Sequence, residues 1–226
     1  MNNYLLSFIT FSKPVIAGVI FLFACLVYNP ITFQRLSFLH EYGKKSLYRY
    51  LFYGMTGFYV LYATALTVLQ YLAWSNTKFT NLLLHMPITN MFKGGTISWL
   101  FNNKLGYFLF YSWGSFWLEI FLIGIMSVLF WLFLHVLRRY NDRFFVDGEV
   151  ELGALMILLI GWPADIIFIG MVFFSVVIVS IARLIIFKEA YTTLGYPFLL
   201  AAFVTLIWGN ALISLFSLGV LQMIRS

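Results

Sequence analysis

Long apolar segments follow one another through almost the whole chain and leave little length for a water-soluble domain. Of the 226 residues, 62% are hydrophobic and only 10% are charged, whereas about 25% are charged in a soluble domain. Only helices satisfy their own backbone hydrogen bonds in continuous apolar runs of this kind. The sequence therefore predicts an all-α, polytopic integral membrane protein that forms one domain over residues 1–226, with the lipid bilayer as its first partner.

The apolar runs predict about six transmembrane helices. The run at 152–187 is too long for one tilted helix and contains Gly161 and Pro163, which favours two helices joined by a turn. Segment 75–104 mixes polar and apolar side chains, which is typical of an interfacial or re-entrant element. The expected spans are 14–29, 51–73, 106–136, 152–162, 166–187 and 195–223.

Most of the fourteen Lys and Arg residues lie in three expected loops, 30–50, 138–151 and 183–194. The positive-inside rule then places these loops in the cytoplasm and both termini on the opposite side. Basic residues in two of the loops are candidates for contact with acidic lipid or a partner protein, although fixing the topology is a sufficient alternative role. These residues are Arg35, Lys44, Lys45, Arg49, Arg138 and Arg139.

The charge distribution and the metal-ligating residue types exclude several function classes. The net charge is +6, but the cations form no continuous basic stripe, which argues against nucleic-acid binding. Cys25 is the only cysteine, so an intrachain disulfide and a cysteine-based metal cluster are excluded. His40, His85 and His135 have no metal-ligand spacing on one helix. We therefore expect no metal and no cofactor.

Three features occur in a fixed order between residues 113 and 209. A long apolar helix ends in WLFLHVLRR at 131–139, a helix opens with GEVELGAL at 148–155, and the last helix opens with YPFLLA at 196–201. This order resembles the C-terminal half of the type IV prepilin peptidases, membrane aspartyl proteases that cut the leader peptide from pilin-like precursors. The resemblance implies a multi-pass protein of the bacterial inner membrane.

The catalytic residues of that family are only partly matched. Its Gly-x-Gly-Asp-x-Lys motif places the catalytic aspartate on Glu149 and the lysine on Glu151. Its other aspartate motif is best matched at 79–89, which puts Thr80 at the first catalytic aspartate and Thr89 near the second acid. Two carboxylates must share one proton in such enzymes, and a hydroxyl cannot replace either at neutral pH. The resemblance therefore implies a divergent relative without the catalytic pair.

Glu149 and Glu119 remain the only candidates for a catalytic acid. An acid at a helix start, such as Glu149, is also explained by the helix dipole alone. Glu119 lies inside the expected span 106–136, where a carboxylate marks a functional-site candidate, although a protonated and packed side chain is the alternative. Asp165 is expected as a solvated residue at the turn of the hairpin, and a pairing of Glu119 with Asp165 is geometrically conceivable.

The leading hypothesis is a non-catalytic, prepilin-peptidase-like inner-membrane component of a secretion, conjugation or pilus-type machine. Its partners would be the other membrane subunits of that machine. One alternative is an active peptidase that uses Glu149 with a second acid. The other is a small transporter or channel, for which Glu119 and Asn210 are the candidate polar residues.

Overall fold

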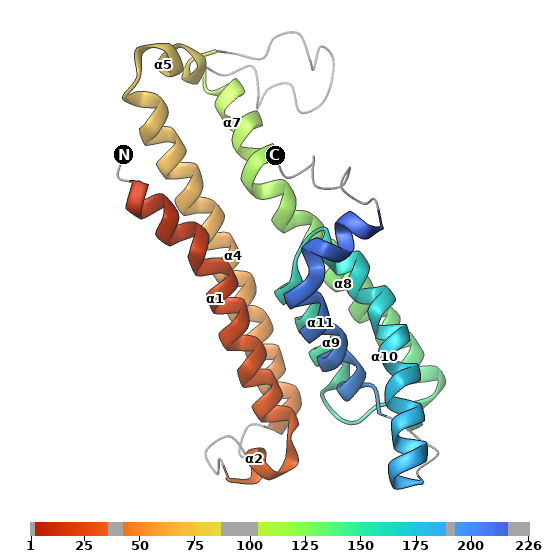
Figure 1. Ribbon diagram of the computed structural model, residues 1–226. Coiled ribbons are helices and arrows are strands. Elements are labelled where there is room, and N and C mark those ends of the chain that lie inside the picture. Colours follow the sequence, from red (N-terminus) through yellow and green to blue (C-terminus); the bar gives the residue numbers. More distant parts are fainter. Residues whose placement is uncertain (1–2, 36–42, 87–103, 189–192, 217–226) are drawn as a thin grey trace.

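The computed structural model describes residues 3–35, 43–86, 104–188 and 193–216. All regular elements in these ranges are helical, which confirms the all-α prediction. Figure 1 shows the long helices side by side along one direction, with α1 and α4 on one side and α8, α9, α10 and α11 on the other. The elements are α1 Asn3–Tyr28, α2 Pro30–Arg35, α4 Gly43–Ser75, α5 Lys78–Leu84, α7 Gly106–Ser112, a π-helical turn Trp113–Trp117, α8 Leu118–Tyr140, a 3-10 turn Asp142–Phe144, α9 Glu149–Ile160, α10 Ala164–Phe187 and α11 Gly195–Leu215.

Five of the described helical segments are long and apolar enough to cross a membrane. Large apolar side chains on these segments point away from the protein, as lipid-facing residues do, because hydrocarbon is the solvent for them. The chain is therefore a multi-pass membrane protein. The segments are Phe11–Tyr28, Gly43–Ser75, Gly106–Tyr140, Ala164–Ile186 and Gly195–Leu215.

The expected fourth span at 152–162 is wrong, because the helix that forms there is too short to cross a membrane. Helix α9 has 12 residues, which gives a length of about 18 Å, well under the roughly 30 Å of bilayer hydrocarbon. Every residue from Glu149 to Leu159 is buried, and α9 packs against α1, α4, α8, α10 and α11. Its side chains are apolar almost all round because protein surrounds it. The expected hairpin is confirmed, with its turn at Gly161, where φ is +78°.

The expected interfacial segment 75–104 is described only in part. It contains the short helix α5 and the first turn before α7, while residues 87–103 lie outside the described ranges. The expected last span also extends beyond the described part of the chain, because α11 is described only to Leu215 and the chain to residue 216.

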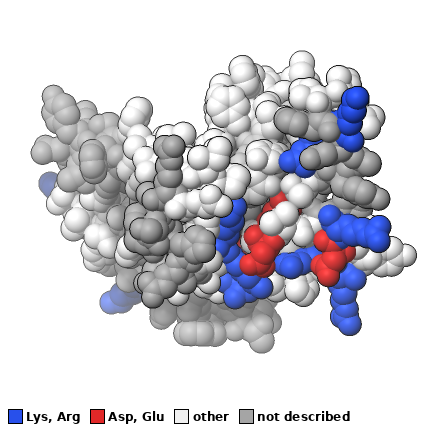
Figure 2. Space-filling model, turned by 90° about the horizontal axis from the view of Figure 1, so that it is seen from below, with Lys and Arg blue, Asp and Glu red and all other residues white. Residues whose placement is uncertain are grey.

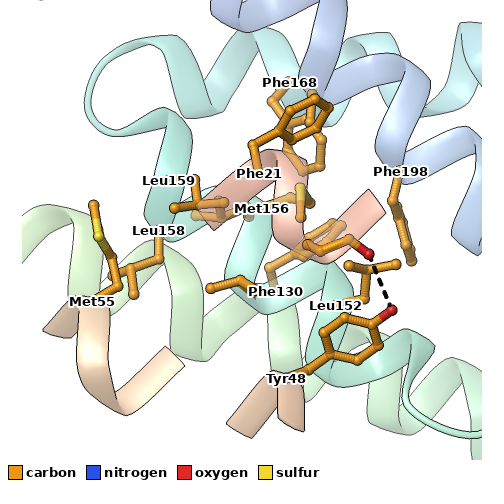
Figure 3. Packing of buried hydrophobic residues seen from close by; sticks show 14 of the residues in the cluster. Phe21, Tyr48, Met55, Phe130, Leu152, Met156, Leu158, Leu159, Phe168 and Phe198 are labelled. Atoms are coloured by element: carbon orange, nitrogen blue, oxygen red, sulfur yellow. Dashed lines mark hydrogen bonds between the residues drawn. The ribbon is translucent and has the colours of Figure 1, made fainter. Parts of the chain in front are cut away.

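The hydrophobic core forms around α9. Met156 and Leu152 of α9 are fully buried, and Phe130 of α8, Phe168 of α10 and Phe198 of α11 surround them (Figure 3). The rings of Phe168 and Phe198 each lie 6.0 Å from the ring of Phe130, in edge-to-face geometry. These ring contacts join α8 to α10 and α11, the helices that enclose α9.

One end of the bundle carries most of its described charges, and we call it the charged end. It holds α2 and the starts of α4, α9 and α11, at the bottom of Figure 1. Seen from below, Lys and Arg side chains gather around a few acidic ones on this face (Figure 2). The start of α1, α5 and the start of α7 lie toward the opposite end (Figure 1). The described parts of the expected basic loops thus lie at one end of the structure.

Candidate functional site

Glu149 is a buried carboxylate at the charged end and the first residue of α9. Its Oε1 accepts hydrogen bonds from the hydroxyl of Tyr28 at 2.8 Å and from the backbone N–H of Gly195 at 2.9 Å. Its Oε2 accepts one from the backbone N–H of Val146 at 3.0 Å. The three donors belong to α1, to the first residue of α11 and to the loop before α9. One side chain therefore joins three separate parts of the chain.

Glycines allow this close approach at the two positions where it is needed. Gly148 has φ +89°, and a Cβ there would lie 3.1 Å from the backbone nitrogen of Lys45 at the start of α4. A Cβ on Gly195 would lie 2.2 Å from carbon atoms of the Tyr28 ring. The Tyr28 ring also meets Tyr196 edge to face, with ring centroids 4.8 Å apart. A larger residue at Gly195 would push the start of α11 away from the end of α1, and one at Gly148 would push the start of α9 away from the start of α4.

Lys44 completes the cluster from the α4 side. Its ammonium group donates a hydrogen bond to the carbonyl of Tyr28 at 3.1 Å and lies 5.6 Å from the centre of the Tyr28 ring. A cation in these positions joins the end of α1 to the start of α4 through a hydrogen bond and a cation–π contact. The Glu149 cluster, meaning Glu149, Tyr28, Gly195, Val146 and Lys44, thus connects four helices.

The second carboxylate of α9, Glu151, points away from Glu149. Two residues along a helix correspond to about 200° of rotation, so the two side chains leave α9 on nearly opposite sides. Glu151 faces α4, where its Oε1 lies 3.2 Å from Arg49 and 4.0 Å from Lys45. The neighbouring positions of the two acids in the sequence therefore do not make a proton-sharing pair.

The family's other acidic position is also far from Glu149. Thr80 lies in α5, beyond the far end of the 33-residue helix α4, a helix about 50 Å long. Its hydroxyl donates to the carbonyls of Trp74 and Thr77, while Thr89 lies outside the described residues. In the described part of the chain, the hydrogen-bond partners of Glu149 are all donors rather than a second acid.

Glu119, the other candidate, faces a polar cavity between the helices. Its Oε1 lies 2.5 Å from the ammonium of Lys13 on α1, and both side chains are about four-fifths buried. The cavity has a volume of about 570 Å³ and is lined by α1, α4, α8, α11 and the turn between α9 and α10. Lys13 lies 5.3 Å from the ring centre of Tyr59. This site combines an ion pair with open space, whereas the side chain of Glu149 is almost fully buried among its hydrogen-bond donors.

Asp165 does not join Glu119, and the expectation of a solvated turn residue is wrong. Asp165 is fully buried, because the hairpin turn lies inside the bundle rather than at a membrane surface. Its Oδ1 accepts from the backbone N–H of Ile166 at 2.9 Å, while Oδ2 is buried without a hydrogen-bond partner among the described residues. Glu119 pairs with Lys13 instead.

The six expected contact residues divide by position. Lys44, Lys45 and Arg49 are engaged within the protein, as described above. Arg138 pairs with Asp142 at 3.3 Å and approaches Asp147 at 4.0 Å. Arg139 is exposed at the charged end, and the side chain of Arg35 lies outside the described part. Arg139 is therefore the exposed member of this set without an ion pair among the described residues.

Sequence reasoning missed Lys13, Tyr28 and Gly195 as site residues. The sequence did contain a signal for Lys13. It is a single lysine at the start of one apolar run, Glu119 is a single glutamate within another, and opposite charges inside membrane segments commonly pair. Tyr28 and Gly195 carried no such signal, since tyrosines and glycines are common at the ends of membrane helices. Within the described ranges, no three His, Cys, Asp or Glu residues lie together as a metal site would require.

Comparisons with protein-family models, with curated proteins and with solved structures gave no match to this chain. The functional inference therefore depends on the two carboxylate sites and on the charged end. The Glu149 cluster can hold helices together, the Glu119 cavity can hold water or a small polar molecule, and the charged end can bind anionic groups.

Proposed function

We propose that this protein is a non-catalytic membrane component that binds other membrane subunits of a secretion, conjugation or pilus-type machine in the bacterial inner membrane. The observation that carries the proposal is the engagement of both oxygens of Glu149 by three donors from separate elements. A catalytic carboxylate must exchange a proton with water or substrate, and a carboxylate whose oxygens are held by protein donors is poorly placed to do so. The resemblance in sequence supplies the class of machine.

With a catalytic role for Glu149 disfavoured, the charged end supports a role in binding other subunits. Lys and Arg side chains gather around acidic ones on this face (Figure 2), Arg138 lies within 4.0 Å of Asp142 and Asp147, and Arg139 is exposed at the end of the same helix. Mixed charges of this kind favour specific orientation of a partner more than they add affinity. The lipid-facing surfaces of the spans offer further contact area for neighbouring helices.

The test is purification of the tagged full chain in mild detergent, followed by mass spectrometry of the proteins retained. Secretion, conjugation or pilus subunits in fixed proportion are the expected result. Arg139→Glu should lower their yield, while Lys78→Glu in α5, at the opposite end, serves as the matched control and should leave it unchanged. Recovery of the chain alone, or with uncleaved pilin-like precursors, would contradict the proposal.

The peptidase alternative has its own test at Glu149. Glu149→Gln keeps the size of the side chain and one acceptor oxygen, so a folded variant is the useful probe. If the unmodified protein cleaved a pilin-like precursor, and the Glu149→Gln variant did not although it was folded, Glu149 would be a catalytic acid. Under the proposal, neither protein cleaves the precursor.

A small transporter or channel is the second candidate function, and the cavity beside Lys13 and Glu119 favours it. An ion pair that is partly exposed inside a membrane bundle can exchange partners with a passing ion or polar solute. Flux of protons or small ions into proteoliposomes, lost in Glu119→Gln, would support this function. Vesicles no leakier than protein-free ones would exclude ion movement.

A further inference from the structure

A second cavity lies between α4 and α8 near the charged end, with α9 as its floor. Its volume is about 380 Å³, and Arg49, Phe52, Trp131 and Glu151 are among the residues that line it. Val128 of α8 lines it too and is half exposed on the outer surface of a membrane-spanning segment. The cavity therefore adjoins the surface where lipid chains lie.

Glu151 gives this cavity a buried hydrogen-bond acceptor. The residue is 7% exposed, and its Oε1 is paired with Arg49. Its Oε2 is buried and has no hydrogen-bond partner in the described part of the chain. Burying a carboxylate oxygen without a hydrogen-bond donor costs free energy. A ligand that donates an N–H group to this oxygen would remove that cost and bind more tightly.

Two cations that are more exposed than Glu151 lie next to it. The side chains of Arg49 and Lys45 are 52% and 41% exposed, and both approach Oε1 of Glu151. Two positive charges against one negative charge leave an excess that attracts an anion, and a guanidinium group suits a phosphate in particular. The more exposed cations, Arg49 in the cavity lining and Lys45 beside it, can thus take a phosphate, while the buried Glu151 can take an ammonium group.

The remaining lining is aromatic and aliphatic. Phe52, Trp131 and Val128 form apolar walls, and the faces of the aromatic rings also attract an ammonium group. Walls of this type accommodate the start of acyl chains that continue into the bilayer. We propose that the cavity binds a phospholipid whose headgroup carries a primary amine, with its phosphate on Arg49 and Lys45 and its ammonium group on Glu151.

This arrangement selects between headgroups by hydrogen bonding. A primary ammonium donates to Oε2 of Glu151, whereas a trimethylated ammonium has no N–H to donate. A glycerol headgroup carries no positive charge to offset the carboxylate. Phosphatidylethanolamine is therefore expected to bind better than phosphatidylcholine or phosphatidylglycerol with the same acyl chains.

The test measures the retention of each of these three dioleoyl lipids by the full chain, delipidated in detergent and examined by native mass spectrometry. Phosphatidylethanolamine should be retained about tenfold more than phosphatidylcholine, the ratio expected for one charge-assisted hydrogen bond. Glu151→Gln should bring that ratio close to one, and Arg49→Gln should lower retention of all three lipids. Glu119→Gln, in the other cavity, should leave the ratio unchanged. Equal retention of the three lipids by the unmodified protein would overturn the proposal.

A second variant protects the test against loss of folding in Glu151→Gln. Val128→Trp fills the mouth of the cavity from an exposed position and leaves the α9 core untouched. It should lower phosphatidylethanolamine retention to the phosphatidylcholine level, and unchanged retention would overturn the proposal. Water-soluble glycerophosphoethanolamine distinguishes a lipid from a free headgroup, because it lacks acyl chains and should not displace the lipid. Displacement at equal concentration would assign the site to the soluble compound instead.

Discussion

Glu149 and Glu119 are both carboxylates held within a bundle of membrane helices, yet their surroundings differ in nearly every respect. Glu149 is 1% exposed and accepts from two backbone N–H groups and one hydroxyl. Glu119 is paired with the flexible side chain of Lys13 and faces a cavity of about 570 Å³. Fixed donors around a buried carboxylate favour a structural role, whereas one flexible partner beside a cavity favours exchange with a ligand. Four single substitutions and one double variant test this difference.

The largest effect is expected for Glu149→Ala. The change leaves the donors from Tyr28, Gly195 and Val146 without their acceptor, which should cost about 3 to 5 kcal/mol of folding free energy. The measurement is the unfolding of purified protein in mixed detergent micelles, followed by circular dichroism. Asp147→Ala, two residues earlier and 68% exposed at its side chain, is the control and should change stability by under about 0.5 kcal/mol. If Glu149→Ala and Asp147→Ala were equally stable, the prediction that Glu149 has a structural role would be wrong.

Gly195→Ala tests the close packing on which the Glu149 cluster depends. A methyl group would meet the Tyr28 ring at 2.2 Å, so α1 and α11 must separate, at a cost of about 2 to 3 kcal/mol. Gly170→Ala in α10 is the matched control, because its Cβ would meet nothing within 4 Å. The same unfolding measurement should show no loss of stability for the control. If Gly195→Ala were as stable as the unmodified protein, the close packing of α11 against Tyr28 would not contribute to stability.

Tyr28→Phe removes one donor and keeps the ring. Glu149 retains both backbone donors, so the expected loss is smaller, about 1.5 kcal/mol. The edge-to-face contact with Tyr196 stays in place, which separates the hydrogen bond from the packing. A loss as large as that of Glu149→Ala would show that the hydroxyl alone carries the cluster.

The sequence predicted the helical class, the hairpin and the shared position of the basic loops, because apolar run length and loop charge determine these features directly. It failed for 152–162, where hydropathy alone cannot distinguish a helix surrounded by protein from one surrounded by lipid. It failed for Asp165 for the same reason, since a turn between two spans was assumed to lie at a membrane surface. Glu149 was identified, but its role depends on donors from Tyr28 and Gly195 that only the tertiary structure brings to it.

The smallest effect on stability is expected for Glu119→Gln, provided that the cavity beside Lys13 and Glu119 contains water. The size of the effect therefore reports whether this cavity is hydrated. If water enters the cavity, removal of the charge by Glu119→Gln should cost under about 1 kcal/mol, as for other hydrated ion pairs. If the site is dry, the uncompensated charge of Lys13 should cost about 3 to 5 kcal/mol.

The double variant Lys13→Met with Glu119→Gln separates these cases, because it removes both charges at once. In a hydrated cavity it should be no more stable than Glu119→Gln, since water already solvates the lone ammonium. In a dry cavity it should recover most of the loss, because no buried charge remains unpaired. Such recovery would make Glu119 a structural residue like Glu149 and end the contrast between the two sites. Without it, the Lys13–Glu119 cavity remains the part of this fold suited to exchange with a small polar ligand.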